Sequence, residues 1–331
     1  MALYPFKFKA QLFHKLWGGH TIEQWYDHVP ADYENVGEAW VISDVEKYQT
    51  EVSNGSHSGD TLQDLLEVYM DELVGGKVYE TFGNQFPILM KFIDAADDLS
   101  IQVHPDDDYA LENEGTLGKT EMWYMLPSGD EAAIYLGWKQ DMNRALIHAA
   151  IQDGSLANYL CEYKVKEGDV ALIPTGTVHA MRKNTILAEI QENSDITYRL
   201  YDYNRIGNDG RKRPLKLDKA LQVMNYSAAK QGVEHPEPIK NGAVNLQKTP
   251  YFTTNIIALT EPAQRDYAPL DSFVAYMCVE GICSVTALDC ETEEKTATLK
   301  VGEAVLIPAS LNDIVIEPAS SCKLLEIYIE L

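Results

Sequence analysis

The stretch "EGDVALIPTGTVHA", residues 167–180, aligns without a gap with "VGEAVLIPASLNDI", residues 301–314, and both follow the pattern G-[DE]-x-x-L-I-P. Each copy has a glycine just before a short apolar run and a proline just after it. This arrangement is typical of a barrel strand that begins after a glycine turn and ends at a proline. A repeat this short can arise between unrelated strands, but we favour a duplicated β-barrel. The alignment sets Asp313 opposite His179, so the C-terminal copy lacks the histidine.

Most of the chain shows the same kind of pattern, with short runs of alternating polarity separated by Gly, Pro, Asn and Asp. This pattern is typical of antiparallel sandwiches and barrels. Helical periodicity appears only at residues 60–75, 141–160 and 216–225, and the second of these is expected to break at Gly154. The sequence therefore predicts a mainly β fold with a few helices. The expected strands include residues 38–43, 87–93, 99–104, 121–126, 169–174 and 185–192.

The length of the chain, 331 residues, exceeds that of a typical single domain, so we expect two or three packed units. Residues 230–249 carry two prolines and two glycines without an apolar period, which is typical of a linker. We predict a first domain over residues 1–235, with a short helical insertion at about 141–160, then a linker over 236–250. A C-terminal β domain is expected over residues 251–331.

The net charge and the cysteines limit the possible partners and the compartment of the protein. A net charge of −24 would repel a nucleic-acid backbone and an anionic membrane surface, so neither is an expected partner. A small anionic substrate would need a locally basic pocket. The five cysteines form no CxxC pair and are odd in number, which favours the reducing cytoplasm over a disulfide framework. The N-terminus lacks the apolar run of a secretory signal, and no segment is apolar enough to span a membrane.

Candidate metal ligands follow from strand alternation. If "LSIQVHP", residues 99–105, is a strand, Gln102 and His104 point to the same face. In "GKTEMWYML", residues 118–126, Lys119 and Glu121 share a face, and a buried glutamate there is costly unless something positive lies beside it. His179 follows a Pro-x-Gly turn that starts a new strand. Together, the two histidines, Glu121 and Gln102 would suit zinc with one position left open.

Each of these residues also has an ordinary interpretation. Gln102 could be a solvated strand residue, Glu121 could pair with Lys119 or Arg199, and His179 could cap a turn. Arg199 could neutralise surface acids, although its guanidinium fork also suits phosphate. The remaining histidines are expected to be surface or structural residues, namely His14, His20, His28, His57, His148 and His235.

Four ordered motifs, "IQVHPDD", "GKTEMWY", "IPTGTVHA" and "QENSDITYRLYDYNR", resemble the type I phosphomannose isomerases in their short bacterial form. The resemblance also includes "LWGG" and "GEAWVISD", and so extends from residue 16 to residue 205. It implies a cupin-type jelly-roll barrel that holds one zinc and interconverts mannose 6-phosphate and fructose 6-phosphate through a cis-enediolate. The C-terminal domain would then be a degenerate cupin-like barrel without metal ligands.

The resemblance carries roles onto individual residues of this chain. Met181 stands where longer members of the family tend to have tyrosine, and their large helical insertion is reduced here to one helical region, which implies a more open site. The zinc ligands would be Gln102, His104, Glu121 and His179. The catalytic residues would be Arg199, Glu189 and Lys119, and the substrate-binding residues Ser100, Lys119, Lys91 and Arg199.

Two other functions stay open at the level of sequence. A non-haem iron cupin oxygenase also uses two histidines and one carboxylate, although a fourth ligand and the nearby cations argue against it. A non-catalytic sugar-binding cupin is the second alternative. The sequence does not decide which group abstracts the C2 proton, or whether the protein is a monomer or a homodimer.

Overall fold

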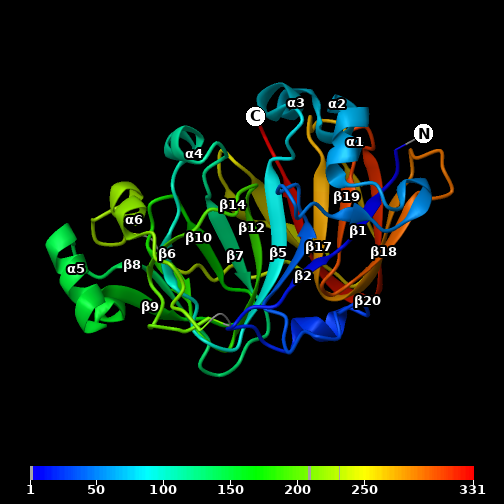
Figure 1. Ribbon diagram of the computed structural model, residues 1–331. Coiled ribbons are helices and arrows are strands. Elements are labelled where there is room, and N and C mark those ends of the chain that lie inside the picture. Colours follow the sequence, from blue (N-terminus) through cyan, green and yellow to red (C-terminus); the bar gives the residue numbers. More distant parts are fainter. Residues whose placement is uncertain (1–2, 208–209, 231) are drawn as a thin grey trace.

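The computed structural model describes residues 3–207, 210–230 and 232–331. It is mainly β, as predicted, and its strands form three sheets (Figure 1). A six-stranded sheet and a five-stranded sheet pack against each other through apolar side chains such as Trp123 and Ile93 from the first and Ile134 and Leu136 from the second. These two sheets form the cupin-type barrel that the sequence leads us to expect.

The chain passes repeatedly between the two sheets of this barrel. In the six-stranded sheet the order is β10 (Val170–Ile173), β7 (Glu121–Met125), β12 (Thr185–Glu192), β5 (Ile88–Ala95), β3 (Glu38–Ile42) and β2 (Gln11–Phe13). In the five-stranded sheet the order is β13 (Tyr198–Tyr201), β6 (Ile101–Val103), β11 (His179–Met181), β8 (Ala133–Trp138) and β9 (Leu160–Lys164). From β5 onward, β8 and β9 are the only described strands of the barrel that follow each other in the same sheet.

The third sheet has nine strands and makes up most of the C-terminal half. The N-terminal strand β1 pairs with β19 of this sheet, so the beginning of the chain is built into the C-terminal barrel. Its main order is β14 (Gly242–Lys248), β15 (Thr253–Leu259), β20 (Asp313–Tyr328), β17 (Val274–Ala287), β19 (Ala304–Ile307), β1 (Phe6–Lys9) and β4 (Glu51–Val52). Two further strands are β16 (Ala263–Asp266), beside β20, and β18 (Thr296–Lys300), beside β17.

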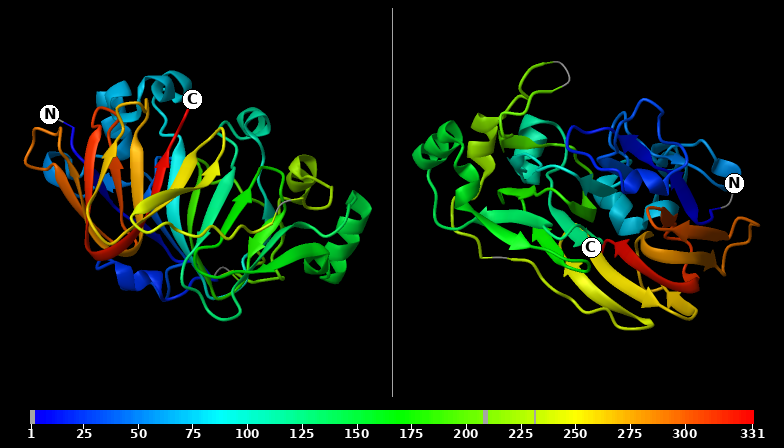
Figure 2. Two further views of the ribbon diagram at one scale, coloured as in Figure 1. Left: turned by 180° about the vertical axis from the view of Figure 1, so that it is seen from behind. Right: turned by 90° about the horizontal axis from the view of Figure 1, so that it is seen from below.

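The helices cover the ends and outer faces of the two barrels. Figures 1 and 2 show α5 and α6 at one end of the molecule and the strands β17 to β20 at the other. The α-helices are α1 (Leu62–Tyr69), α2 (Asp71–Val74), α3 (Gly76–Phe82), α4 (Asp107–Asn113), α5 (Arg144–Asp153) and α6 (Leu217–Val223). Short 3₁₀ helices are η1 (Ile22–Trp25), η2 (Gly55–His57) and η3 (Leu156–Tyr159). Among the described residues, no helix is long and apolar enough to cross a membrane.

The two copies of the sequence repeat have the same local structure. Gly168 and Gly302 both adopt positive φ, at 87° and 88°, a conformation that favours glycine. Each leads into a short strand, β10 or β19, that ends before the proline. His179 and Asp313 are the first residues of the strands that follow, β11 and β20. The predicted correspondence of the two segments is therefore confirmed at the level of the backbone.

Two predictions about the secondary structure need correction. The single helix expected over residues 60–75 is divided at Met70, whose φ is 48°, although its start at Thr61 is a full capping box with Asp64. The linker expected over residues 236–250 contains the seven-residue strand β14, which pairs with β15 along its length. The helical region expected at 141–160 is present as α5 and η3, and Gly154 ends α5 in a left-handed conformation. The domain boundaries themselves stay a prediction.

Candidate active site

The predicted metal ligands lie on neighbouring elements of the first barrel. Gln102 is in β6 and pairs in register with His179, the first residue of β11. His104 follows β6 by one residue, and Glu121 begins β7 in the facing sheet. The alternation rule thus correctly placed Gln102 and His104 on one face, and the barrel brings Glu121 to them from the opposite sheet.

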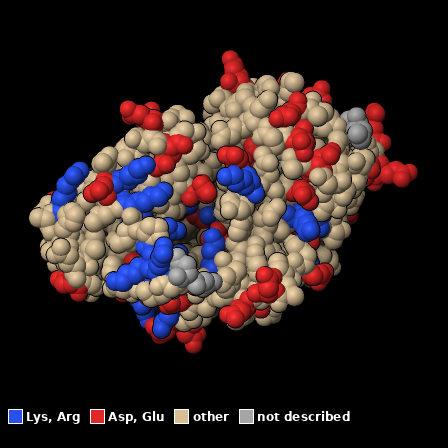
Figure 3. All heavy atoms as spheres, viewed as in Figure 1, with Lys and Arg blue, Asp and Glu red and all other residues tan. Residues whose placement is uncertain are grey.

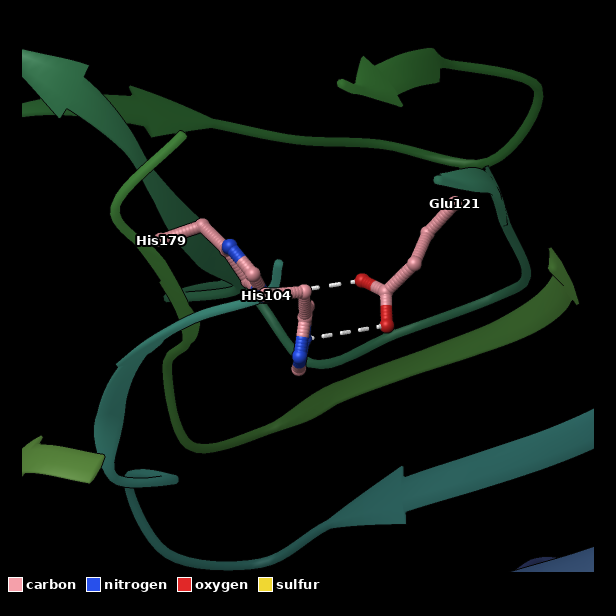
Figure 4. A group of neighbouring side chains, drawn as sticks. All are labelled: His104, Glu121 and His179. Carbon is pink, nitrogen blue, oxygen red and sulfur yellow. Dashed lines mark ion pairs between the residues drawn. The ribbon is translucent and has the colours of Figure 1, made fainter. Parts of the chain in front are cut away.

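The two histidines converge on one carboxylate (Figure 4). Nε2 of His104 lies 3.2 Å from Oε1 of Glu121, and Nε2 of His179 lies 3.5 Å from Oε2. One ligand atom from each of the three residues falls within 4.8 Å of the others, and all three side chains are buried. At this spacing a cation can lie between the three ligand atoms and contact all of them.

The tautomers of both rings suit metal binding. Nδ1 of His104 is 2.7 Å from the Ile196 carbonyl oxygen, and Nδ1 of His179 is 2.8 Å from that of Thr177. A carbonyl oxygen can only accept, so each Nδ1 donates and each Nε2 keeps its lone pair toward Glu121. Burial, together with the Lys119 ammonium, lowers the pKa of His104 to about 3, and burial also lowers the pKa of His179. Both imidazoles are therefore neutral at pH 7.

Several polar atoms of this group lack hydrogen bonds. Nε2 of His104 and both carboxylate oxygens of Glu121 are buried without a hydrogen bond of acceptable geometry, although Lys119 Nζ lies 2.8 Å from Oε1. Burial alone would raise the pKa of Glu121, but the Lys119 ammonium holds it well below its ordinary value. An ionised carboxylate beside two neutral imidazoles, one of which has no hydrogen-bond partner at Nε2, is the donor set that a zinc ion fits.

Gln102 and Ser100 extend this group toward solvent. The Gln102 amide nitrogen lies 3.4 Å from Nε2 of His179, so rotation about the last side-chain bond brings the amide oxygen to the same place. Ser100 donates a hydrogen bond of 3.4 Å to the Gln102 amide oxygen. Gln102 can therefore act as a fourth, oxygen ligand.

A cavity of about 280 Å³ opens beside the His104, Glu121 and His179 group. Figure 3 shows a hollow on this face with lysine and arginine side chains around it. All of the predicted substrate-binding and catalytic residues line the cavity, namely Lys91, Ser100, Lys119, Glu189 and Arg199. A strongly acidic protein therefore has a basic pocket, as a small anionic substrate would require.

Glu189 and Lys91 form a buried pair on the cavity wall. Nζ of Lys91 lies 2.9 Å from Oε2 of Glu189, and Trp123 Nε1 donates to Oε1 at 3.1 Å. Burial and the neighbouring Glu121 raise the pKa of Glu189 to about 7. Burial alone would lower the pKa of Lys91, but its acidic neighbours raise it to about 12. The wall thus carries a fixed cation beside a carboxyl group that can exchange a proton near neutral pH.

A second, partly buried ion pair on this wall was not predicted from the sequence. Glu38 lies 2.9 Å from Lys15 Nζ and accepts a hydrogen bond of 2.7 Å from Trp40 Nε1. Burial alone would raise the pKa of Glu38, but Lys15 and Lys91 lower it to about 2. Alternation in "EAWVI" could have placed Glu38 and Trp40 on one face, whereas nothing in the sequence links them to Lys15.

Two arginines border the open side of the cavity. Arg199, on β13, is in register with Gln102, and its Nε has no hydrogen-bond partner. Burial and the nearby Arg213 lower the pKa of Arg199. Arg213 was not predicted to be a site residue, and its fork is bound to Asp202 at 2.6 and 2.7 Å. Arg199 therefore keeps donors available for a ligand.

Comparison with known proteins identifies similar chains. A family model described as phosphomannose isomerase type I, catalytic domain, matches residues 5–124. A mannose-6-phosphate isomerase of Bacillus subtilis is 32% identical over 326 residues, which cover 97% of this chain and 98% of that protein. One of Streptococcus mutans is 33% identical over 280 residues, covering 77% of this chain and 85% of the relative. The crystal structure of a Bacillus subtilis mannose 6-phosphate isomerase superposes with a TM-score of 0.82 at 30% identity, over 99% of this chain and 100% of that one.

Proposed function

The chain belongs to the type I phosphomannose isomerase family, and from this premise we propose that it interconverts mannose 6-phosphate and fructose 6-phosphate in a zinc-dependent reaction. The observation that carries the proposal is the buried group of His104, Glu121 and His179, in which His104 Nε2 and both Glu121 oxygens lack a hydrogen bond, beside a cavity lined by cations. One zinc ion per chain would be held by these three residues and Gln102. When bound, zinc supplies a Lewis acid that polarises the oxygens on C1 and C2 of the sugar.

The cations of the cavity would bind the anionic substrate. Lys119 and Ser100 are the candidates for the phosphate group, and Lys91 adds a positive charge that its raised pKa keeps at neutral pH. Several cations can balance a phosphate dianion, even though the protein as a whole is strongly negative.

The isomerisation moves a proton between C2 and C1 of the open-chain sugar through a cis-enediolate. Glu189 is our candidate for the group that carries this proton, because it lines the cavity and its pKa of about 7 lets it accept and return a proton. Trp123 and Lys91 fix the orientation of its carboxyl group. Arg199 would stabilise the negative charge that develops on the enediolate oxygen.

The setting of the proposed enzyme is the cytoplasm. All five cysteines are free thiols in the structure, which is usual in a reducing compartment. Its partner would be a small sugar phosphate rather than a nucleic acid or a membrane, as the net charge of −24 indicates. Whether the chain acts as a monomer or a homodimer stays a prediction.

The test is conversion of mannose 6-phosphate to fructose 6-phosphate by purified protein, before and after chelation and again after zinc is restored. We expect activity that chelation abolishes and zinc restores, and no turnover of mannose without the phosphate. Metal analysis of the same samples should find one zinc per chain. Absence of turnover in zinc-loaded protein, or unchanged turnover without metal, would contradict the proposal. Bound iron with oxygen consumption would favour the oxygenase instead.

A further inference from the structure

The position of Glu121, which begins β7, depends on the short segment that precedes it, Gly118–Thr120. Lys119, from this segment, and Glu121, next in sequence, form an ion pair of 2.8 Å at the cavity. Gly118 packs so closely on the start of α4 that a Cβ atom there would come within 2.7 Å of the Asp107 nitrogen. The position of this backbone therefore decides where both charged groups lie.

Two carboxyl groups hold the backbone amides of this segment. Asp107 accepts a hydrogen bond of 2.7 Å from the Gly118 amide, and Glu192 accepts one of 2.6 Å from the Thr120 amide. The amide of Glu192 in turn donates to the Thr120 carbonyl oxygen at 3.2 Å. Asp107 begins α4 and Glu192 ends β12, so the segment is clamped from two separate elements.

The two carboxyl groups also contact each other. Asp107 and Glu192 are hydrogen-bonded through their side chains, and Glu192 is 3% exposed. Glu192 is buried against a second carboxyl group, which favours its protonated form, so Glu192 carries the proton of the pair and donates it to Asp107. Burial, with a smaller contribution from Asp107, raises the pKa of Glu192 to about 8, although the hydrogen bond from the Thr120 amide opposes the shift. The other titratable groups that face the pair are Asp106 and Tyr251, neither of which is a cation.

The pair does not lie in the cavity. Side chains alternate along a strand, so Glu192 points to the opposite side of β12 from Gln191, and Glu189 shares the Gln191 side. Glu192 therefore has no direct route to a substrate and can influence the reaction only through the backbone of Gly118–Thr120.

We propose that Glu192 is a positioning residue for Lys119 and Glu121, which it holds in place through the Thr120 amide while it donates a hydrogen bond to Asp107. The inference rests on the proposed isomerase function. Because folding raises the pKa of Glu192, the stability that its proton contributes is complete below the pKa of an ordinary glutamate, declines as the pH rises above that value and is lost at about pH 8. Two negative charges would then repel each other and loosen the segment that carries Lys119.

The experiment compares Glu192→Gln with Glu192→Leu in zinc-loaded protein. The glutamine oxygen still accepts from the Thr120 amide, and its NH₂ group donates to Asp107 without titrating. We expect Glu192→Gln to keep the wild-type kcat at pH 7 and to lose the fall in kcat that the wild type shows above pH 8. Glu192→Leu should lower kcat about 10- to 100-fold at both pH values with zinc still bound, since small displacements of catalytic groups are costly.

An infrared measurement tests the proton on Glu192 without any assay of activity. The difference between the infrared spectra of wild-type protein and Glu192→Gln should contain a protonated-carboxyl band at pH 7 that disappears with a midpoint near pH 8, because the contribution of Glu189 is common to both proteins and cancels. A wild-type alkaline fall in kcat that persists in Glu192→Gln, or the absence of this band from the difference spectrum, would overturn the proposal. If the wild type has no isomerase activity, the proposed function fails. The infrared band then still tests whether Glu192 carries a proton beside Asp107. If Glu192→Leu does not fold, Glu192→Gln still decides.

Discussion

Two glutamates, Glu121 in the first barrel and Glu326 in the C-terminal barrel, are both completely buried, but their surroundings differ. Glu326 accepts hydrogen bonds of 2.7, 3.0 and 3.1 Å from Arg265 and one of 2.7 Å from Asn255, with a further bond from Tyr267. Glu121 has instead the lone pairs of two imidazoles and a single ammonium group at its oxygens. One carboxylate is fully satisfied by protein donors, and the other is not.

The difference shows what turns a barrel core into a metal site. A saturated network such as that of Glu326 stabilises a fold and offers no lone pair to an ion. Buried ligand atoms without a hydrogen bond, such as His104 Nε2 and the two Glu121 oxygens, are costly unless a cation joins them. Across the described ranges, one group of at least three His, Cys, Asp or Glu ligands converges in this way, and it lies in the first barrel. The two barrels thus contain a buried carboxylate in two opposite environments.

The largest expected effect is the loss of the metal centre in Glu121→Gln. The neutral amide removes the only carboxylate from the ligand group, so zinc binding should fail and turnover should drop by more than about a thousandfold. The measurements are kcat and the zinc content of the purified variant. The matched control is Glu326→Gln, which should keep both. If Glu121→Gln had the zinc content and turnover of the wild type, Glu121 would not be a metal ligand.

The next effect is that of Arg199→Ala on the chemical step. Its loss should reduce kcat about 10²- to 10³-fold while zinc stays bound, as expected for one donor to the transition state. Arg265→Ala serves as the control, because Arg265 forms an ion pair with Glu326 and lies outside the described cavity. The turnover of folded Arg265→Ala should match the wild type. An unchanged kcat in Arg199→Ala would exclude that residue from the mechanism.

Much of the first barrel could be predicted because its strands follow the alternation of buried and exposed positions. Period two was enough to pair Gln102 with His104 and Lys119 with Glu121, and the repeat located the turn before His179. The neighbours of these residues across the barrel could not be predicted, since Lys15 and Glu38 meet only after folding. An ion pair made from distant segments leaves no local pattern.

The errors have local physical causes. β14 is an edge strand with mostly half-exposed residues, so its sequence shows no alternation strong enough to distinguish it from a linker. The helix over residues 60–75 is interrupted at Met70, where the backbone turns to a positive φ that the apolar periodicity does not reveal. Helix α4 was not among the predicted helices; its cap is Asp106, which accepts a hydrogen bond from the Tyr109 amide at 3.0 Å.

A smaller effect is expected on the free energy of unfolding of Glu326→Gln. The amide can replace some hydrogen bonds but not the charge that Arg265 requires, so we expect a loss of about 1.5–3 kcal/mol. Urea unfolding of the zinc-loaded proteins measures it, with Glu317→Gln, an exposed residue of the same strand, as a control that should change little. An unchanged free energy in Glu326→Gln would mean that the network is not a stabilising one.

The smallest effect is expected for Asp313→His, which restores the histidine of the first repeat. Asp313 is partly exposed, accepts a hydrogen bond of 2.6 Å from Gln264 and lies opposite Asp266 in register. A histidine there would relieve a contact between two like charges, so the free energy of unfolding should change by no more than about 0.5 kcal/mol. Zinc content should stay at one per chain, since the buried carboxylate of this barrel, Glu326, is already satisfied by protein donors. A second zinc would show that the missing histidine alone, rather than the satisfied network, keeps the C-terminal barrel free of metal.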